Sequence, residues 1–161
     1  MILGIDAARN QTGWALMAEN ERLVTTGVIK IDHSGGDHRT ALSIVRDELT
    51  KVEYVANVNG VEIAGVFIES AYLGPSARVA IAHSQWIGNV EAIAWRIFRY
   101  ALIEMMPPRE WRSALGIKGT GKSPVKEYVT DKYPEGKDRT QDEDDAICIA
   151  LAGQRKVEPV A

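Results

Sequence analysis

Four acidic residues stand where buried segments of the sequence begin or end. Asp6 ends one short apolar run and Glu69 ends another, so each follows a strand that should be covered. Asp142 and Asp145 lie three residues apart, hence on one face of a predicted helix whose next residues are apolar. A charged carboxylate at such a place is costly unless a cation, a hydrogen-bond network or a raised pKa relieves it. These four residues are therefore the first candidates for chemistry.

If the four carboxylates converge, a cation must lie between them. Neighbours about 4 Å apart would repel by roughly 4 kcal/mol per pair at an effective dielectric constant near 20. Oxygen ligands without clusters of histidine or cysteine favour Mg²⁺ or Mn²⁺ over Zn²⁺. Two such ions, about 3.5 to 4 Å apart, clamp a scissile phosphate, activate a water and stabilise the leaving 3′ oxygen. We therefore hypothesise a phosphodiester hydrolase with two Mg²⁺ ions per active site, for which Mn²⁺ can substitute.

Local helix chemistry offers another interpretation of the C-terminal acids. The run Thr140-Gln141-Asp142-Glu143 has the form of a capping box, and the helix dipole favours acids in a first turn. Capping explains Asp142 as well as a metal does, but it explains Asp145 less well because the first turn is already over. Whether Asp142 or Asp144 completes the metal site also stays open, so the case depends on all the acids together.

The surrounding pattern predicts an α/β fold. Short apolar or alternating runs at 2–7, 12–18 and 23–31 predict an antiparallel meander of three strands. Two more strands are expected at 63–68 and 101–106, and helical spacing predicts helices at 38–55, 76–100, 123–132 and 140–154. If the later strands run parallel to the first, this order gives an RNase H-like mixed five-stranded sheet, three antiparallel strands and then two parallel ones, with helices on both faces. We expect one domain over 1–161.

Composition limits the classes of function. The 161 residues show no basic leader and no stretch of 18 apolar residues, so we expect a cytoplasmic protein without a signal peptide or a membrane span. The single cysteine, Cys148, suits a reducing compartment. A net charge of −3 argues against a protein that holds DNA by bulk positive charge alone.

Two local features qualify this picture. Between Pro107 and Thr140 the chain is rich in lysine and arginine, which predicts either a DNA-facing surface or an ordinary solvated face. The predicted helix 76–100 is apolar nearly all round, which is more than packing on one sheet requires. We expect it to meet a second subunit as well.

Several short motifs, taken in order, resemble those of the RuvC-like Holliday junction resolvases of the RNase H-like superfamily, and in particular its short, phage-type members. They span nearly the whole chain: Ile2-Leu3-Gly4-Ile5-Asp6, Thr12-Gly13-Trp14-Ala15, Phe67-Ile68-Glu69, Lys122-Ser123 and Asp142-Glu143-Asp144-Asp145-Ala146. The resemblance implies a homodimeric crossover junction endodeoxyribonuclease of DNA recombination and repair. Such an enzyme cuts one strand of a branched DNA in each of two active sites and leaves 5′ phosphates.

The resemblance also implies roles for single residues. Asp6, Glu69, Asp142 and Asp145 would be the catalytic metal ligands, and Lys122 would be a catalytic basic residue near the scissile phosphate. The expected DNA contacts are Tyr72, Arg112, Lys118, Lys122 and Lys126. Tyr72 falls where the family often has an aromatic residue that stacks at the junction centre, worth about 1 to 3 kcal/mol per base; the alternative is an ordinary amphipathic loop residue. Ala7-Ala8-Arg9 stands where the family often has Pro-Gly, so the first hairpin and the substrate range, including flaps, are open.

Other functions compete with this interpretation. Residues 116–123 satisfy the Walker A pattern of nucleotide-binding P-loop proteins. A P-loop follows a buried strand, however, whereas two prolines and several charged residues precede this one, and little chain remains for further parallel strands. The opening of the chain also resembles the phosphate loop of actin-like ATPases and sugar kinases, which need two such domains. A broader branched-DNA or flap nuclease and a non-catalytic DNA-binding scaffold are the remaining alternatives.

Overall fold

The computed structural model describes residues 1–31, 38–71, 76–119, 121–136 and 138–157. Its elements follow the chain in this order: β1 (Ile2–Asp6), β2 (Gln11–Ala18), β3 (Arg22–Lys30), α1 (His38–Val58), β4 (Gly65–Glu69), α2 (Ala77–Ile97), β5 (Leu102–Met106), α3 (Pro108–Leu115), α4 (Lys122–Lys132), a 3₁₀ turn (Pro134–Gly136) and α5 (Gln141–Val157). No helix of these residues combines the length and the apolarity needed to cross a membrane.

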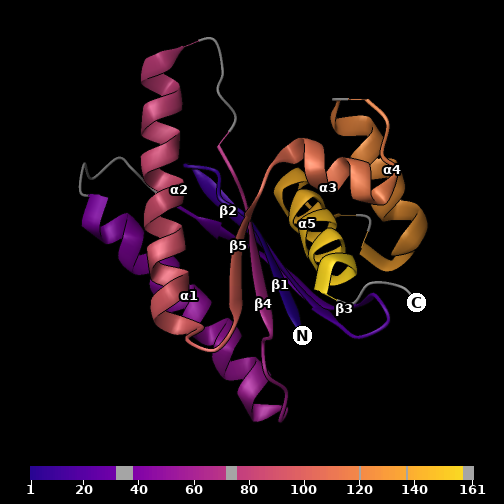
Figure 1. The fold of residues 1–161 in the computed structure, drawn as a ribbon, viewed down its shortest axis with the longest axis horizontal. Helices are drawn as coiled ribbons and strands as arrows, with labels where there is room; N and C mark the ends of the chain where they lie inside the picture. Colours follow the sequence, from indigo (N-terminus) through magenta and orange to yellow (C-terminus); the bar gives the residue numbers. More distant parts are fainter. Residues whose placement is uncertain (32–37, 72–75, 120, 137, 158–161) are drawn as a thin grey trace.

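The strands form one mixed sheet in the order β3-β2-β1-β4-β5. β1, β2 and β3 pair antiparallel, whereas β4 and β5 run parallel to β1. This arrangement confirms the fold class expected from the sequence. Because β1, β4 and β5 point the same way, Asp6, Glu69 and Met106 reach the same edge of the sheet (Figure 1).

Helices cover both faces of the sheet. Figure 1 shows α1 and α2 on one side and α3, α4 and α5 on the other. Side chains alternate between the two faces along each strand, so Leu3 and Ile5 join the core under α1 and α2, while Ile2 and Phe67 join the core under α5. The central strands are therefore buried on both sides, which explains their nearly continuous apolar runs.

Two glycines let α5 lie directly on the sheet. A Cβ atom at Gly4 would collide with the backbone around Ala146, and one at Gly13 would collide with the carbonyl group of Asp142. Since Gly13 pairs with Asp6 across β1 and β2, the close approach sets the first turn of α5 beside the end of β1.

The sequence reading missed one helix, α3. Two successive prolines usually mark a break in regular structure, but Pro107 is the N-cap of α3 and Pro108 is its first residue, where a fixed φ suits a helix. Gly116, with φ of 70°, ends α3 in the left-handed conformation. The buried residues Trp111 and Leu115 lie four apart and give the helix its inner face. The other expected elements are present, with ends that differ by a few residues.

Candidate active site

The structure brings the four predicted carboxylates together at one edge of the sheet. Asp6 ends β1, Glu69 ends β4, and Asp142 and Asp145 lie in the first two turns of α5, which begins at this edge (Figure 1). The charge of Asp6 interacts with those of Glu69, Asp145 and Asp142. Residues from three separate segments therefore form one acidic cluster, defined here as these four side chains.

Burial and mutual repulsion make the acidic cluster reluctant to ionise. Burial, together with the charges of Glu69, Asp145 and Asp142, raises the pKa of Asp6 from 3.8 to about 8. Burial raises the pKa of Glu69 from 4.5 to about 7, although a hydrogen bond from Trp111 acts in the opposite direction. Burial likewise raises the pKa of Asp145 from 3.8 to about 6. A divalent cation would relieve this tension by favouring the charged forms.

Neutral N–H groups hold three of the four carboxylates. The indole Nε1 of Trp111 donates to Glu69 Oε2 over 2.8 Å, and Gln141 Nε2 donates to Asp145 Oδ1 over 3.0 Å. Gln11 Nε2 donates to Asp142 Oδ2. Within the described part of the chain, no side chain donates to Asp6, the acid whose pKa is raised most.

Sequence reasoning did not find these donors. Trp111 lies on the helix that was not expected. Gln11 stands directly before the recognised Thr12-Gly13 pair, and Gln141 directly precedes Asp142, so their places beside the motifs were the available signal.

The side chains of the acidic cluster have the ligand chemistry of a hard cation, but their spacing is wider than a bound cation requires. Among the residues that the structure describes, no three Asp, Glu, His or Cys side chains are already arranged to hold a metal ion. All four ligand groups are carboxylates, the set that Mg²⁺ and Mn²⁺ prefer. Metal binding by these residues stays a prediction, and it would require their side chains to draw closer.

The two aspartates left open by the sequence have different surroundings. Asp144 is fully buried, and its carboxylate lies 3.3 Å from both Arg139 Nε and Lys126 Nζ. Asp142 is the one whose charge acts on Asp6. The geometry therefore favours Asp142 as the fourth member of the acidic cluster, whereas Asp144 belongs to a buried ion-pair group.

The expected capping box also forms, between Thr140 and Glu143. Thr140 N donates to Glu143 Oε2 over 2.9 Å, and Glu143 N donates to Thr140 Oγ1 over 3.3 Å. Thr26 Oγ1 of β3 donates to Glu143 Oε1 over 2.9 Å as well. Glu143 therefore caps the helix, and Asp142 remains beside Asp6.

The predicted basic residues have different surroundings. The guanidinium of Arg112 lies 4.6 Å from the ring centre of Trp111, and its positive charge opposes the rise in the pKa of Glu69 and of Asp145. Lys118 and Lys122 are exposed. The ammonium group of Lys126 instead pairs with Asp144 and donates to the Arg139 carbonyl over 3.0 Å, so Lys126 contributes to packing within the protein. Its contact with DNA stays a prediction.

Tyr72, the predicted stacking residue, lies outside the described residues, so its role stays a prediction.

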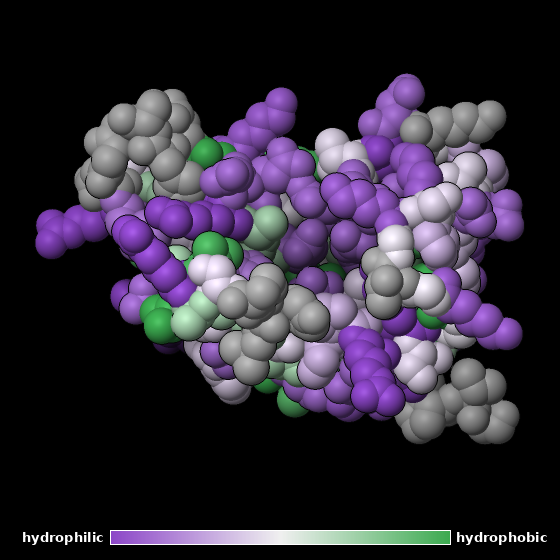
Figure 2. All heavy atoms as spheres, turned by 90° about the horizontal axis from the view of Figure 1, so that it is seen from above, coloured by the Kyte–Doolittle hydropathy of each residue, from purple (hydrophilic) through white to green (hydrophobic). Residues whose placement is uncertain are grey.

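A groove borders the acidic cluster. It encloses about 1250 Å³ and runs from Ser70, the residue after Glu69, past Arg109 and Arg112 of α3 to Lys118. Figure 2 looks onto this end of the molecule and shows hydrophilic side chains around a hollow in the face. The groove brings positive side chains to the edge of an otherwise acidic site, as a polyanion substrate would require.

The Walker A-like segment does not have the structure of a P-loop. In the described part of this segment, residues 116–119 and 121 follow α3 and Lys122 begins α4, so the segment lies between two helices and not between a strand and a helix. Arg112 Nη1 donates to the carbonyl oxygens of Gly119 and Gly121 over 3.3 and 3.5 Å. This arrangement counts against the nucleotide-binding alternative.

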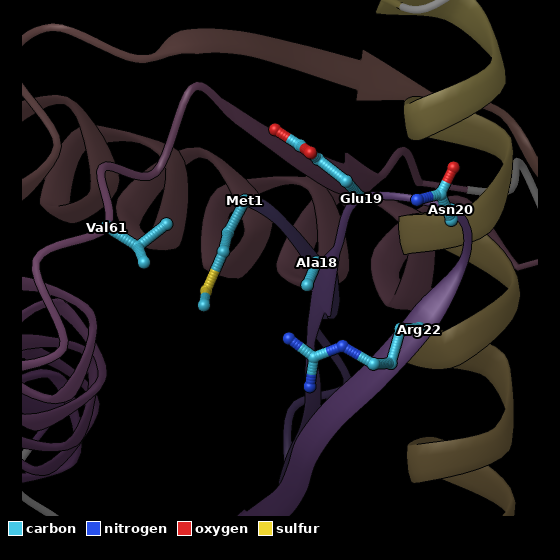
Figure 3. A pocket seen from close by; sticks show the side chains of 6 residues that line it. All are labelled: Met1, Ala18, Glu19, Asn20, Arg22 and Val61. Carbon is cyan, nitrogen blue, oxygen red and sulfur yellow. The ribbon is translucent and has the colours of Figure 1, made fainter.

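A second, smaller hollow lies at the opposite end of the sheet. It encloses about 350 Å³ between the start of β1, the turn from β2 to β3 and the segment after α1 (Figure 3). Among the described side chains that line this hollow, Glu19 is the one acidic residue, so the hollow has no group of carboxylates comparable to the acidic cluster.

Comparison with known proteins agrees with the geometry. No protein-family model and no curated protein matches the sequence, so the phage-type assignment stays a prediction. The chain has a RuvC-like, RNase H-like fold. It is similar to Thermus thermophilus RuvC in complex with a Holliday junction substrate (TM-score 0.78, 17% identity, 98% of this chain and 94% of that chain) and to a second Thermus thermophilus RuvC structure (TM-score 0.73, 17% identity, 98% and 95%).

Proposed function

We propose that the protein is a divalent-metal-dependent endonuclease that hydrolyses phosphodiester bonds at four-way or other branched DNA junctions, as a RuvC-like resolvase. The observation that carries the proposal is the gathering of Asp6, Glu69, Asp142 and Asp145 at one edge of a RuvC-like sheet. The solved structure with TM-score 0.78 is a RuvC bound to a Holliday junction, which supports the same class of substrate here.

The acidic cluster would hold two Mg²⁺ ions, or Mn²⁺ in their place. When bound, such ions activate a water and stabilise the leaving oxygen of the phosphodiester. The chain's own contribution is to hold its carboxylates: Trp111 binds Glu69, Gln141 binds Asp145 and Gln11 binds Asp142. Because these donors are neutral, they orient the carboxylates without cancelling the charge that attracts the cations.

The groove beside the acidic cluster is the proposed path of a DNA strand. Lys118 and Lys122 are exposed and can contact backbone phosphates. Lys122 is the one proposed to lie near the scissile phosphate. Arg112 lines the groove and fixes the loop that carries Lys118 through the carbonyl groups of Gly119 and Gly121. Since the net charge is −3, binding relies on this local surface and should weaken steeply with salt.

A homodimer through α2 would supply two active sites for one junction. Ile81 and Trp95 of α2 are 59% and 52% exposed, and at helical spacing they share a stripe with Gly88 and Ala92, which are also exposed. A Cβ atom at Gly88 would meet nothing within 4 Å. The stripe is symmetric about Gly88, so a second copy crossing antiparallel would set Ile81 of one chain against Trp95 of the other.

The direct test uses labelled four-way junction, flap and linear duplex of shared sequence, each with Mg²⁺ or EDTA. We expect paired nicks in two opposed strands of the junction, in Mg²⁺ only. Equal cutting of flaps would indicate the broader branch nuclease. Binding of the junction without cutting in either Mg²⁺ or Mn²⁺ would indicate a DNA-binding scaffold and overturn the proposal.

A further inference from the structure

The side chain of Trp111 connects α3 to the acidic cluster. It is 1% exposed, and its Nε1 donates to Glu69 Oε2 over 2.8 Å, across 42 residues of chain. It packs in the buried core beneath α5 together with Phe67, which stands two residues before Glu69 on β4. The indole group is therefore fixed on its apolar side by the core and on its polar side by a carboxylate.

The backbone explains why a residue of α3 reaches Glu69. Glu69 pairs with Met106 at the end of the parallel ladder, and Ser70 N donates to the Met106 carbonyl over 3.0 Å. Pro107 follows at once as the N-cap of α3, and Trp111 N donates back to the Pro107 carbonyl over 3.3 Å. The first turn of α3 is thus tied to the strand end that carries Glu69.

The chemistry of indole suits the task of holding a metal ligand. Its N–H only donates, does not ionise in water and belongs to a rigid ring. A lysine or arginine at the same place would neutralise Glu69 and compete with a cation. The guanidinium of Arg112 lies over the ring face of Trp111, 4.6 Å from its centre, which adds a second contact that restrains the ring.

We infer that Trp111 is a positioning residue, which holds one oxygen of Glu69 so that the carboxylate faces the other acids and can bind a divalent cation. The inference rests on the proposed function, because it assumes that the acidic cluster binds such a cation. Loss of an outer hydrogen-bond partner of a metal ligand typically weakens metal affinity by about 10- to 100-fold. We expect a loss of that size when the indole N–H is removed.

The test compares Trp111→Phe with Trp86→Phe in the DNA-free, full-length protein. Both replace a fully buried tryptophan by a smaller apolar ring, but Trp86 belongs to α2 and to the core on the opposite face. Isothermal titration calorimetry with Mn²⁺ should show affinity lowered about 10- to 100-fold in W111F and unchanged in W86F. Equal affinity of W111F and the wild type, or equal losses in both variants, would overturn the inference.

Two further measurements separate positioning from packing. In a Glu69→Gln background, W111F should cause no additional loss of Mn²⁺ affinity, because the residue acts through Glu69; an undiminished loss would contradict this. In the ¹⁵N spectrum of the unsubstituted protein, the indole N–H signal of Trp111 should shift when Mg²⁺ is added. The E69Q substitution by itself should also shift this signal. The indole signal of Trp86 should stay in place in both experiments. An unmoved Trp111 signal overturns the inference even if W111F does not fold.

These outcomes are distinct from failure of the proposed function. If the wild type binds Mn²⁺ and W111F binds it equally well, only the role of Trp111 is wrong. If the wild type binds no Mn²⁺ at all, the metal-dependent nuclease itself is contradicted, and the role of Trp111 falls with it.

Discussion

Gly13 of β2 lies against the backbone carbonyl of Asp142, with no space for a side chain between them. Gly13 is also the partner of Asp6 in the antiparallel pairing of β1 and β2. This contact sets how closely the first turn of α5 can approach the end of β1. It therefore links a glycine with no chemistry of its own to the distance between two of the acids.

Gly13→Ala should push the start of α5 away from the sheet. Overpacking of this kind costs about 1 to 3 kcal/mol, so urea unfolding should show a free energy of unfolding lowered by that amount. Mn²⁺ affinity should fall as well, because Asp142 and Asp145 move with the helix. Gly121→Ala at the start of α4 is the matched control, since a Cβ there comes no nearer than 3.8 Å to the Pro124 side chain; equal stability losses in the two variants would contradict the account.

The stability of the metal-free protein should fall as the pH rises from about 5 to about 8. Unfolded carboxyl groups ionise near their ordinary pKa of 3.8 to 4.5, but in the folded protein the pKa values of Asp145, Glu69 and Asp6 are about 6, 7 and 8. The unfolded state then binds fewer protons than the folded state, so stability is fully present below the unfolded pKa and is lost through the folded one. Tm in EDTA measures this directly.

Added Mg²⁺ should reverse this loss, because a ligand that binds only the folded state stabilises it. Asp6→Asn should flatten the pH dependence of Tm in EDTA. A Tm that rises across this pH range in EDTA, or a slope of Tm against pH that D6N leaves unchanged, would show that folding does not raise the pKa values of the acidic cluster.

The proposed dimer predicts a specific sensitivity of α2. Trp95→Glu places a charge on the exposed stripe and should convert the dimer to a monomer in sedimentation velocity, with loss of paired nicking. Tyr54→Glu changes an exposed aromatic residue of α1, 68% exposed, and should leave the dimer intact. A wild-type monomer at micromolar concentration, or a W95E dimer, would contradict the interface.

Lys122 and Lys126 should respond differently to alanine. Lys122→Ala should weaken DNA binding and reduce the slope of log affinity against log salt by about 1, since one phosphate contact is lost. Lys126→Ala should mainly lower the free energy of unfolding, by about 1 to 3 kcal/mol, because buried Asp144 loses a partner. Binding isotherms at several salt concentrations and urea unfolding distinguish the two; an equal fall in salt slope would give Lys126 the DNA contact.

The sheet and its acids could be predicted because their signals are local. Alternating or continuous apolar runs mark the strands, and Asp6 and Glu69 stand where those runs end. Parallel strands then place their final residues at one edge, whatever the details of packing. The same reasoning located the helix face of Asp142 and Asp145.

The remainder depends on tertiary contacts that spacing does not encode. Asp142 and Asp144 share the first turns of α5, and only the packing of Lys126 and Arg139 shows that Asp144 is held in an ion-pair group. Helix α3 is short, and two prolines stand at its start, Pro107 as the N-cap and Pro108 as the first residue; such a pair usually signals a break. With it the sequence reading missed Trp111 and the groove beside Glu69.

The central claim is that the acidic cluster cuts DNA, and Asp6→Asn tests it most directly. With enzyme in excess over a labelled four-way junction in Mg²⁺, the account predicts paired nicks by the wild type. For D6N it predicts cutting slowed by several orders of magnitude, with junction binding retained. Cutting by D6N at the wild-type rate would contradict the account.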